Sequence, residues 1–135
     1  MSGEKNLEIL LAELRPRLHE ETYVFCSLPS GRVGDLAHAS PIATVMEAEG
    51  LTVVISQAQA DQEGLAYSGA FRCITLEVHS SLEAVGLTAA VSGALASRSI
   101  SANMIAGAFH DHVFVPASAV EEAMTTLRAL STPAS

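Results

Sequence analysis

The chain has no tryptophan, and phenylalanine and tyrosine together make up only 4% of its 135 residues. Basic residues are also scarce, with seven lysines and arginines against fifteen aspartates and glutamates, and the formal net charge is −8. A protein that binds a phosphate backbone needs clustered basic residues to displace counterions. This sequence has no such cluster, so we expect no nucleic-acid partner.

Long apolar segments are missing as well. After position 83 the longest uncharged run covers residues 84–97, and its small and hydroxylated side chains make a poor membrane span. The N-terminal segment carries Glu4, Glu8 and Glu13 among its leucines, which argues against a secretory signal peptide. We therefore expect a cytoplasmic protein with no membrane partner.

The chain has only two cysteines, Cys26 and Cys73, and each stands among apolar residues of a predicted strand. Cysteines in such surroundings are commonly buried, reduced thiols. A disulfide between them would need an oxidising compartment, of which the sequence gives no sign. We expect two buried free thiols.

Small and aliphatic residues are abundant: 49% of the chain is hydrophobic and 16% is charged, a balance that supports a folded core. Hydrophobic periodicity and turn residues predict the order of helices and strands. The predicted elements are a helix at 4–18, broken near Pro16; a strand at 22–28; a loop at 31–41; a hairpin at 42–47 and 51–56, with a helix over 42–48 as the alternative to its first arm; a helix at 57–63; a strand at 71–79; a helix at 84–97; strands at 102–108 and 112–115; and a helix at 116–130.

The two halves of the chain form a weak repeat. Residues 53–60 align with residues 113–120, because in each segment a strand leads directly into a helix. Two ferredoxin-like βαββαβ units that share or exchange a strand explain this order, so we predict an α+β fold with units at residues 1–68 and 69–135. The C-terminal unit lacks its last strand, which residues 22–28 or a partner chain would supply.

The predicted helix at 84–97 carries small residues on one side, at Gly86, Ala90, Gly93 and Ala94. Small side chains allow two elements to approach closely, so we expect this side to pack against a neighbour. The N-terminus of the same helix has free backbone N–H groups, which can bind a carboxylate.

Residues 71–130 resemble the ACT domain. Glu83, Gly86 and Leu87 match the acidic residue, glycine and aliphatic residue that the family has where its first strand meets its helix. Ser99, Ile100 and Asn103 match the end of that helix and the start of the next strand, whereas Val85 replaces a frequent proline. The element order as a whole resembles small, stand-alone bacterial proteins with two ACT units, of which residues 4–64 would be the degenerate first unit.

The resemblance implies a non-enzymatic regulatory module that binds a small molecule, an amino acid above all, at an interface between ACT units. It also implies a homo-oligomer and no cofactor. The residues that match the ligand-binding positions are Ser81, Glu83, Ala84, Val85, Gly86, Leu87, Asn103 and Met104.

Three histidines are candidates for a second kind of chemistry. In a ferredoxin-like sheet the strand that ends at His79 meets the strand that begins at His112, and His110 shares the face of His112. Three imidazoles there could hold a Zn²⁺ ion with an open position, contact a ligand in a pH-dependent manner, or simply be polar side chains with satisfied hydrogen bonds. A metal-dependent enzyme and a ligand-free interaction adaptor are therefore the alternatives to the regulatory module.

Overall fold

Strand β1 (Arg15–Leu28) belongs to both compact units of the computed structural model, which describes residues 6–78 and 85–131. Met1–Glu20 and Arg72–Ser135 form one unit, which we call the terminal unit. Glu21–Phe71 forms the other, the middle unit. Residues 15–20 of β1 therefore lie in the terminal unit, and residues 21–28 lie in the middle unit.

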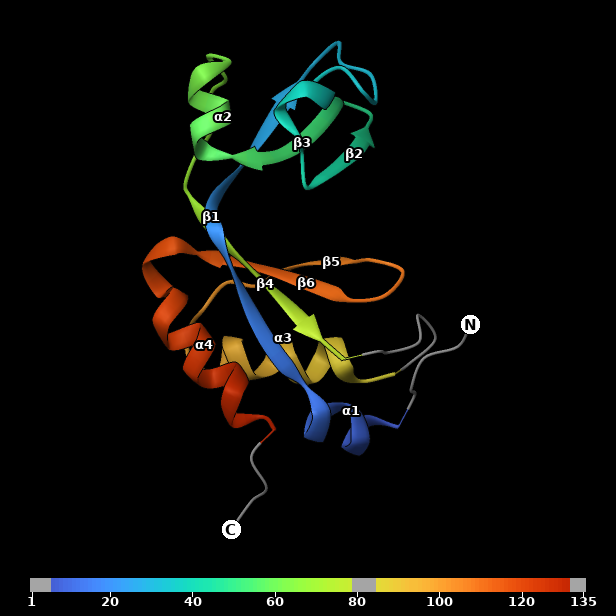
Figure 1. Ribbon diagram of the computed structural model, residues 1–135, viewed down its shortest axis with the longest axis vertical. Coiled ribbons are helices and arrows are strands. Elements are labelled where there is room, and N and C mark those ends of the chain that lie inside the picture. The colour runs from blue at the N-terminus through green and yellow to red at the C-terminus, as the bar shows by residue number, and fades with distance from the viewer. Residues whose placement is uncertain (1–5, 79–84, 132–135) are drawn as a thin grey trace. The chain divides into compact units, whose positions relative to one another are not determined.

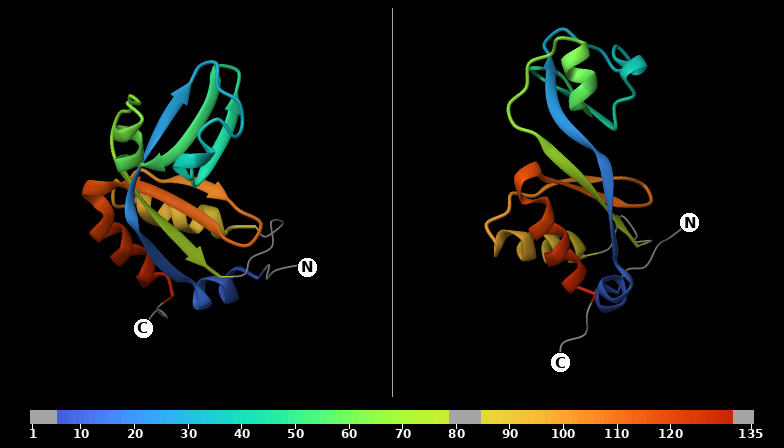
Figure 2. Two further views of the ribbon diagram at one scale, coloured as in Figure 1. Left: turned by 45° about the horizontal axis from the view of Figure 1, so that its top comes forward. Right: turned by 60° about the vertical axis from the view of Figure 1, so that its left-hand side comes forward.

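The terminal unit is a sheet with helices packed on it (Figures 1 and 2). Its sheet order is β1-β4-β6-β5. The elements are α1 (Leu7–Glu13), β4 (Phe71–Glu77), α3 (Leu87–Ala96), β5 (Asn103–Ala106), β6 (Asp111–Pro116), the 3₁₀ turn η2 (Ala117–Ala119) and α4 (Val120–Ala129).

The core of the terminal unit lies between the sheet and its helices. Alternate residues of β4 and β6, such as Ile74 and Val113, are fully buried on one face of the sheet. The helices cover this face with aliphatic side chains. The fully or nearly fully buried members are Leu10, Leu14, Ile74, Leu76, Leu87, Val91, Leu95, Val113, Val115, Ala123 and Leu127.

The strand order confirms the ferredoxin-like α+β fold. Counted from β4, the terminal unit has first strand, helix, second strand, third strand and helix, with the third strand placed between the first two. Residues 15–20 of β1 lie beside β4 and supply the fourth strand. The sequence predicted residues 22–28 or a partner chain for this part. The strand is the predicted one, because β1 contains residues 22–28, but the segment in the terminal unit is residues 15–20, which lies upstream of them.

That error arose because residues 15–18 were assigned to a helix. Helix α1 ends at Glu13, and Leu14 already has the extended angles φ −61° and ψ 128°. Proline has no N–H to donate within a helix, and it drives the preceding residue towards an extended conformation. Pro16 thus favours an end to the helix at Glu13, three residues upstream, and the chain continues as β1.

The middle unit is built on a hairpin. Strands β2 (Ala43–Glu47) and β3 (Gly50–Ser56) pair antiparallel, and β3 also pairs with β1, where Val24 lies opposite Ile55. The hairpin prediction is confirmed and the alternative of a helix over 42–48 is wrong. The 3₁₀ turn η1 (Ala37–Ala39) precedes the hairpin, and α2 (Gln57–Gln62) follows it. Its buried core is Val24, Cys26, Ala39, Leu51, Val53, Ile55 and Ala60.

The small residues on one side of α3 are closely packed only in part: a Cβ at Gly86 would lie 3.1 Å from the Leu7 side chain, whereas Gly93 is open. Leu87, Val91 and Leu95 are the buried residues of the helix, whereas Gly93 is exposed. Within the described part of the chain, no atom comes within 4 Å of a Cβ built at Gly93, apart from its own helix backbone and chain neighbours. The prediction of close packing is therefore wrong at this position.

Both cysteines are buried and free, as predicted. None of the helices in residues 6–78 and 85–131 has the length and apolar character that a membrane crossing requires.

Candidate functional site

Helix α3 begins at Gly86, whose φ of 103° is one that glycine adopts without strain. The first helical bond runs from the Ala90 N–H to the Gly86 carbonyl, at 2.8 Å. The N–H groups of the first turn therefore have no acceptor inside the helix, and no described side chain caps them. Val85, immediately before the turn, is 84% exposed. Such a helix end can receive an anion.

The predicted ligand-binding residues around this turn divide into two groups. Val85, Gly86 and Leu87 are described, and Leu87 has its side chain in the core while its backbone belongs to the first turn. Ser81, Glu83 and Ala84 lie outside the described residues, so their part in a site stays a prediction.

Asn103 and Met104 lie elsewhere in the terminal unit. Asn103 is exposed at the start of β5, where its side-chain amide donates to the Phe114 carbonyl at 3.4 Å. Met104 is partly buried against the core. Figures 1 and 2 show that β5 begins near the end of α3, whereas Gly86 is at the start of that helix. The fold does not bring Asn103 and Gly86 together within one terminal unit.

Of the three histidines predicted to cluster, the structure describes His110 and His112. His112 lies on β6, and its Nδ1 is 2.9 Å from Oγ1 of Thr75 on β4. His110 stands just before β6, and its buried Nδ1 has no hydrogen-bond partner among the described residues. His79 lies outside the described residues, so the cluster of His79, His110 and His112 stays a prediction.

A different group surrounds His112. His19 on β1 places its Nε2 2.6 Å from the same Thr75 hydroxyl. Taking one ligand atom from each, His19, Cys73 and His112 lie within 4.8 Å of one another. We call these three residues the His–Cys cluster. It is contributed by the neighbouring strands β1, β4 and β6, all in the terminal unit.

The sequence analysis missed two of these residues because it placed His19 after a helix and treated Cys73 only as a core residue. The alternation of residues along the predicted strands could have indicated which side chains share this face. Cys73 and Thr75 alternate with the core residues Ile74 and Leu76 on β4, so they face the opposite side of the sheet. Recognising Pro16 as the start of a strand would have added His19 to that face.

Thr75 fixes the two imidazoles by hydrogen bonding. Its side chain is buried, with 1% exposure. A hydroxyl has one proton to donate and two lone pairs, so at least one of the two rings must donate its N–H to Oγ1. Burial lowers the pKa of both His19 and His112, and neighbouring positive charge lowers each further.

The surroundings of the cluster also hold Cys73 as a thiol. Burial raises the pKa of Cys73 to about 11, although Arg17 and a hydrogen bond with Thr75 act in the opposite direction. Arg17 itself pairs with Glu77 at 2.9 Å. The Arg72 guanidinium donates a hydrogen bond to the His19 carbonyl at 2.7 Å, and this bond connects β4 to the backbone of β1 beside the cluster.

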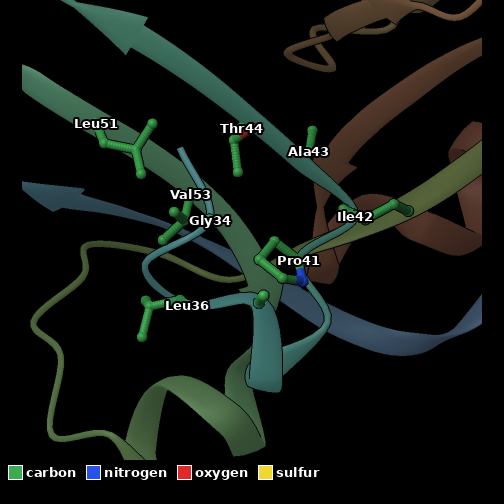
Figure 3. Close-up of a pocket in the computed structure, with 9 residues that line it drawn as sticks. Gly34, Leu36, Pro41, Ile42, Ala43, Thr44, Leu51 and Val53 are labelled. Atoms are coloured by element: carbon green, nitrogen blue, oxygen red, sulfur yellow. The ribbon is translucent and has the colours of Figure 1, made fainter. Parts of the chain in front are cut away.

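The middle unit has an open pocket of about 250 Å³ (Figure 3). Residues from the loop after β1, from β2 and from β3 line it, and no charged side chain is among them. The lining residues are Gly34, Leu36, Ala37, Pro41, Ile42, Ala43, Thr44, Leu51 and Val53. Part of the pocket is formed by the segment that follows β1, the first strand of the middle unit. The corresponding segment of the terminal unit in sequence is residues 78–86, which follows β4.

Comparison with known families finds two consecutive domains in the chain. A family model described as "ACT domain" matches residues 2–72, and a second with the same description matches residues 69–129. These consecutive matches confirm the predicted resemblance. No curated protein sequence matches the chain.

Three solved structures are similar to the chain. A Vibrio cholerae protein of unknown function, described as a possible transport protein, is 46% identical, with a TM-score of 0.86 over 95% of this chain and 98% of that chain. An Agrobacterium tumefaciens protein is 15% identical, with a TM-score of 0.73 over 87% and 89% of the two chains. The ligand-free regulatory subunit of aspartate kinase from Thermus thermophilus is 10% identical, with a TM-score of 0.65 over 89% and 97%.

Proposed function

This chain belongs to the ACT domain family, and on that basis we propose that it is a non-enzymatic regulatory module whose ligand is an amino acid. The observation that carries the proposal is the first turn of α3. Its N–H groups, which no described side chain caps, follow Gly86 and an exposed Val85, so we expect a ligand carboxylate to approach them from solvent. The fold it shares with a regulatory subunit of aspartate kinase supports a regulatory role.

The ligand-binding residues of this proposal are Ser81, Glu83, Ala84, Val85, Gly86, Leu87, Asn103 and Met104. A helix N-terminus alone contributes about 0.3–1 kcal/mol at an exposed position. Useful affinity therefore requires further contacts with the rest of the ligand, which we assign to the polar Asn103 and the neighbouring Met104.

These further contacts imply a homo-oligomer. Helix α3 has 10 residues and is about 15 Å long, and Gly86 and Asn103 lie towards its opposite ends. An amino acid is too short to touch both in one terminal unit. In the proposed site the first turn of α3 comes from one copy of the chain and Asn103 from another.

The test is a thermal-shift screen against the twenty amino acids, with a dye as reporter because tryptophan is absent. A ligand at about one hundred times its Kd adds roughly 2.7 kcal/mol to the free energy of unfolding, which shifts Tm by several degrees. We expect one or a few amino acids to raise Tm equally with and without a chelator. A flat screen in which chelator lowers Tm would favour a metal site over the amino-acid site, and a screen flat in both conditions would favour the adaptor.

The variant Val85→Asp tests where the carboxylate binds. A negative charge beside the first turn repels an anionic ligand, and we expect the affinity to fall roughly tenfold. Val33→Asp is the matched control, since Val33 is 69% exposed in the middle unit. Isothermal titration should find wild-type affinity in the control, and an equal loss in both variants would contradict the assignment.

A further inference from the structure

The three side chains of the His–Cys cluster offer the donor atoms that zinc prefers. Protein zinc sites use imidazole nitrogen at about 2.0–2.1 Å and cysteine sulfur at about 2.3 Å, in tetrahedral geometry. Two ligand atoms of such a site are then about 3.3–3.8 Å apart. The ligand atoms of His19, Cys73 and His112 already lie within 4.8 Å of one another, so a contraction of at most about 1.5 Å would bring them to this spacing.

The fold holds these side chains in place before any ion arrives. Each ligand is on a different strand, and the three strands are neighbours in one sheet. The Thr75 hydroxyl contacts one nitrogen of each imidazole, at 2.6 and 2.9 Å. In known sites, hydrogen bonds of this kind orient a metal-binding histidine through one ring nitrogen while the metal takes the other.

Access and selectivity both favour a zinc-like ion. Cys73 is fully buried, whereas His19 and His112 are partly exposed, so an ion can enter on the side of the two rings. Among residues 6–78 and 85–131 no carboxylate joins the cluster, and the described residues therefore offer little to oxygen-preferring ions such as Mg²⁺ and Ca²⁺. A thiolate with two imidazoles suits Zn²⁺ and similar borderline-soft ions.

We propose that His19, Cys73 and His112 bind one Zn²⁺ ion, through one imidazole nitrogen of each histidine and the Sγ of Cys73. The fourth position is open to water or to a donor atom of another molecule, as in three-ligand zinc sites. Binding replaces the thiol proton of Cys73, which is released to solvent. The site is separate from the first turn of α3 and does not depend on the proposed amino-acid ligand.

The test uses the full chain after chelator treatment, with Zn²⁺ titrated against a chromophoric competitor and Co²⁺ as a spectroscopic probe. We expect one ion per chain and a thiolate-to-cobalt charge-transfer band in the near ultraviolet. Cys73→Ser should abolish that band, and Cys73→Ser, His19→Asn and His112→Asn should each weaken Zn²⁺ binding at least tenfold.

The chain offers matched controls for both ligand types. Cys26 is the other buried thiol, and His38 is an exposed imidazole of the middle unit, 3.2 Å from Glu63. Cys26→Ser and His38→Asn should bind Zn²⁺ as the wild type does. The proposal is overturned if the wild type binds no stoichiometric Zn²⁺, if the charge-transfer band survives Cys73→Ser, or if the controls lose as much affinity as the cluster variants.

A second measurement on the wild type covers the case in which a cluster variant fails to fold. Alkylation of Cys73 and Cys26 is followed by peptide mass spectrometry in mild urea, with and without Zn²⁺. Zn²⁺ should slow modification of Cys73 at least tenfold and leave Cys26 unchanged. Equal rates for Cys73 with and without Zn²⁺, or equal protection of both thiols, would refute the site.

Discussion

Thr75 is the polar residue of the described core, since every other side chain in residues 6–78 and 85–131 that is buried to the same degree is hydrophobic. Its hydroxyl is shared by His19 and His112, which come from the strands on either side of β4. A buried polar group is tolerated when its hydrogen bonds are made and costs free energy when they are not. The arrangement therefore links three neighbouring strands of the terminal unit, β1, β4 and β6, through one hydroxyl.

Replacing Thr75 by valine keeps the shape and removes this hydroxyl. The two partly buried imidazole nitrogens then lose their contact with the hydroxyl, and we expect the free energy of unfolding to fall by about 1–3 kcal/mol. Urea denaturation followed by circular dichroism, with chelator present, measures the change. Thr52→Val is the control, because the Thr52 hydroxyl donates to Glu47 at an exposed position of β3, and it should cost less than about 0.5 kcal/mol. Equal costs would contradict the role assigned to Thr75.

At the scale of single elements, the outcome of the sequence analysis depended on whether the signal was local. The hairpin of β2 and β3 was found because two apolar runs flank a turn with Gly50, and the helices of the terminal unit were found from their periodicity. The start of β1 was missed because the leucine spacing continues to Leu18, past the helix end that Pro16 imposes.

The candidate sites show the same limit. The glycine at the start of α3 was identified from its local pattern, and Gly86 does begin that helix. The His–Cys cluster was not identified, because His19, Cys73 and His112 are far apart in sequence and meet only through the pairing of β1, β4 and β6. Strand order is a property of the whole fold, and no motif near His19 announces it.

Helix α3 itself offers a test of packing. Gly93 is exposed in the middle of this helix, and a Cβ there would meet no described atom outside its own helix. Glycine costs about 0.5–1 kcal/mol relative to alanine within a helix, so Gly93→Ala should raise the free energy of unfolding by that amount. Chemical denaturation gives the value. Gly50→Ala is the contrasting variant: its Cβ would come within 2.5 Å of the Leu28 carbonyl oxygen, so we expect a loss. A destabilised Gly93→Ala would indicate that this face is covered in solution.

At the scale of the whole molecule, the proposed ligand site needs two copies of the chain. Val85→Asp damages the first turn of α3, and Asn103→Ala removes the exposed amide at the start of β5, so each variant alone should bind the amino acid poorly. When equal amounts exchange subunits, half of the dimers are mixed, and each mixed dimer has one intact site of two. We expect about a quarter of the wild-type binding capacity to return. Isothermal titration of the mixture measures it, and a mixture that binds no better than either variant would place the whole site within one chain.

The terminal unit is discontinuous in sequence, since its residues 15–20 are separated from β4 by the whole middle unit. During synthesis the ribosome therefore makes the fourth strand of this unit before the middle unit, and the other three strands after it. Residues 15–20 of β1 have no partner strand in this unit until β4 emerges from the ribosome. Pairing β1 with β4 closes a loop of some fifty residues, which has an entropic cost and slows folding. A substitution in residues 15–20 that weakens their pairing with β4 should therefore slow the closure of this loop, although the segment itself is synthesised long before its partner strand.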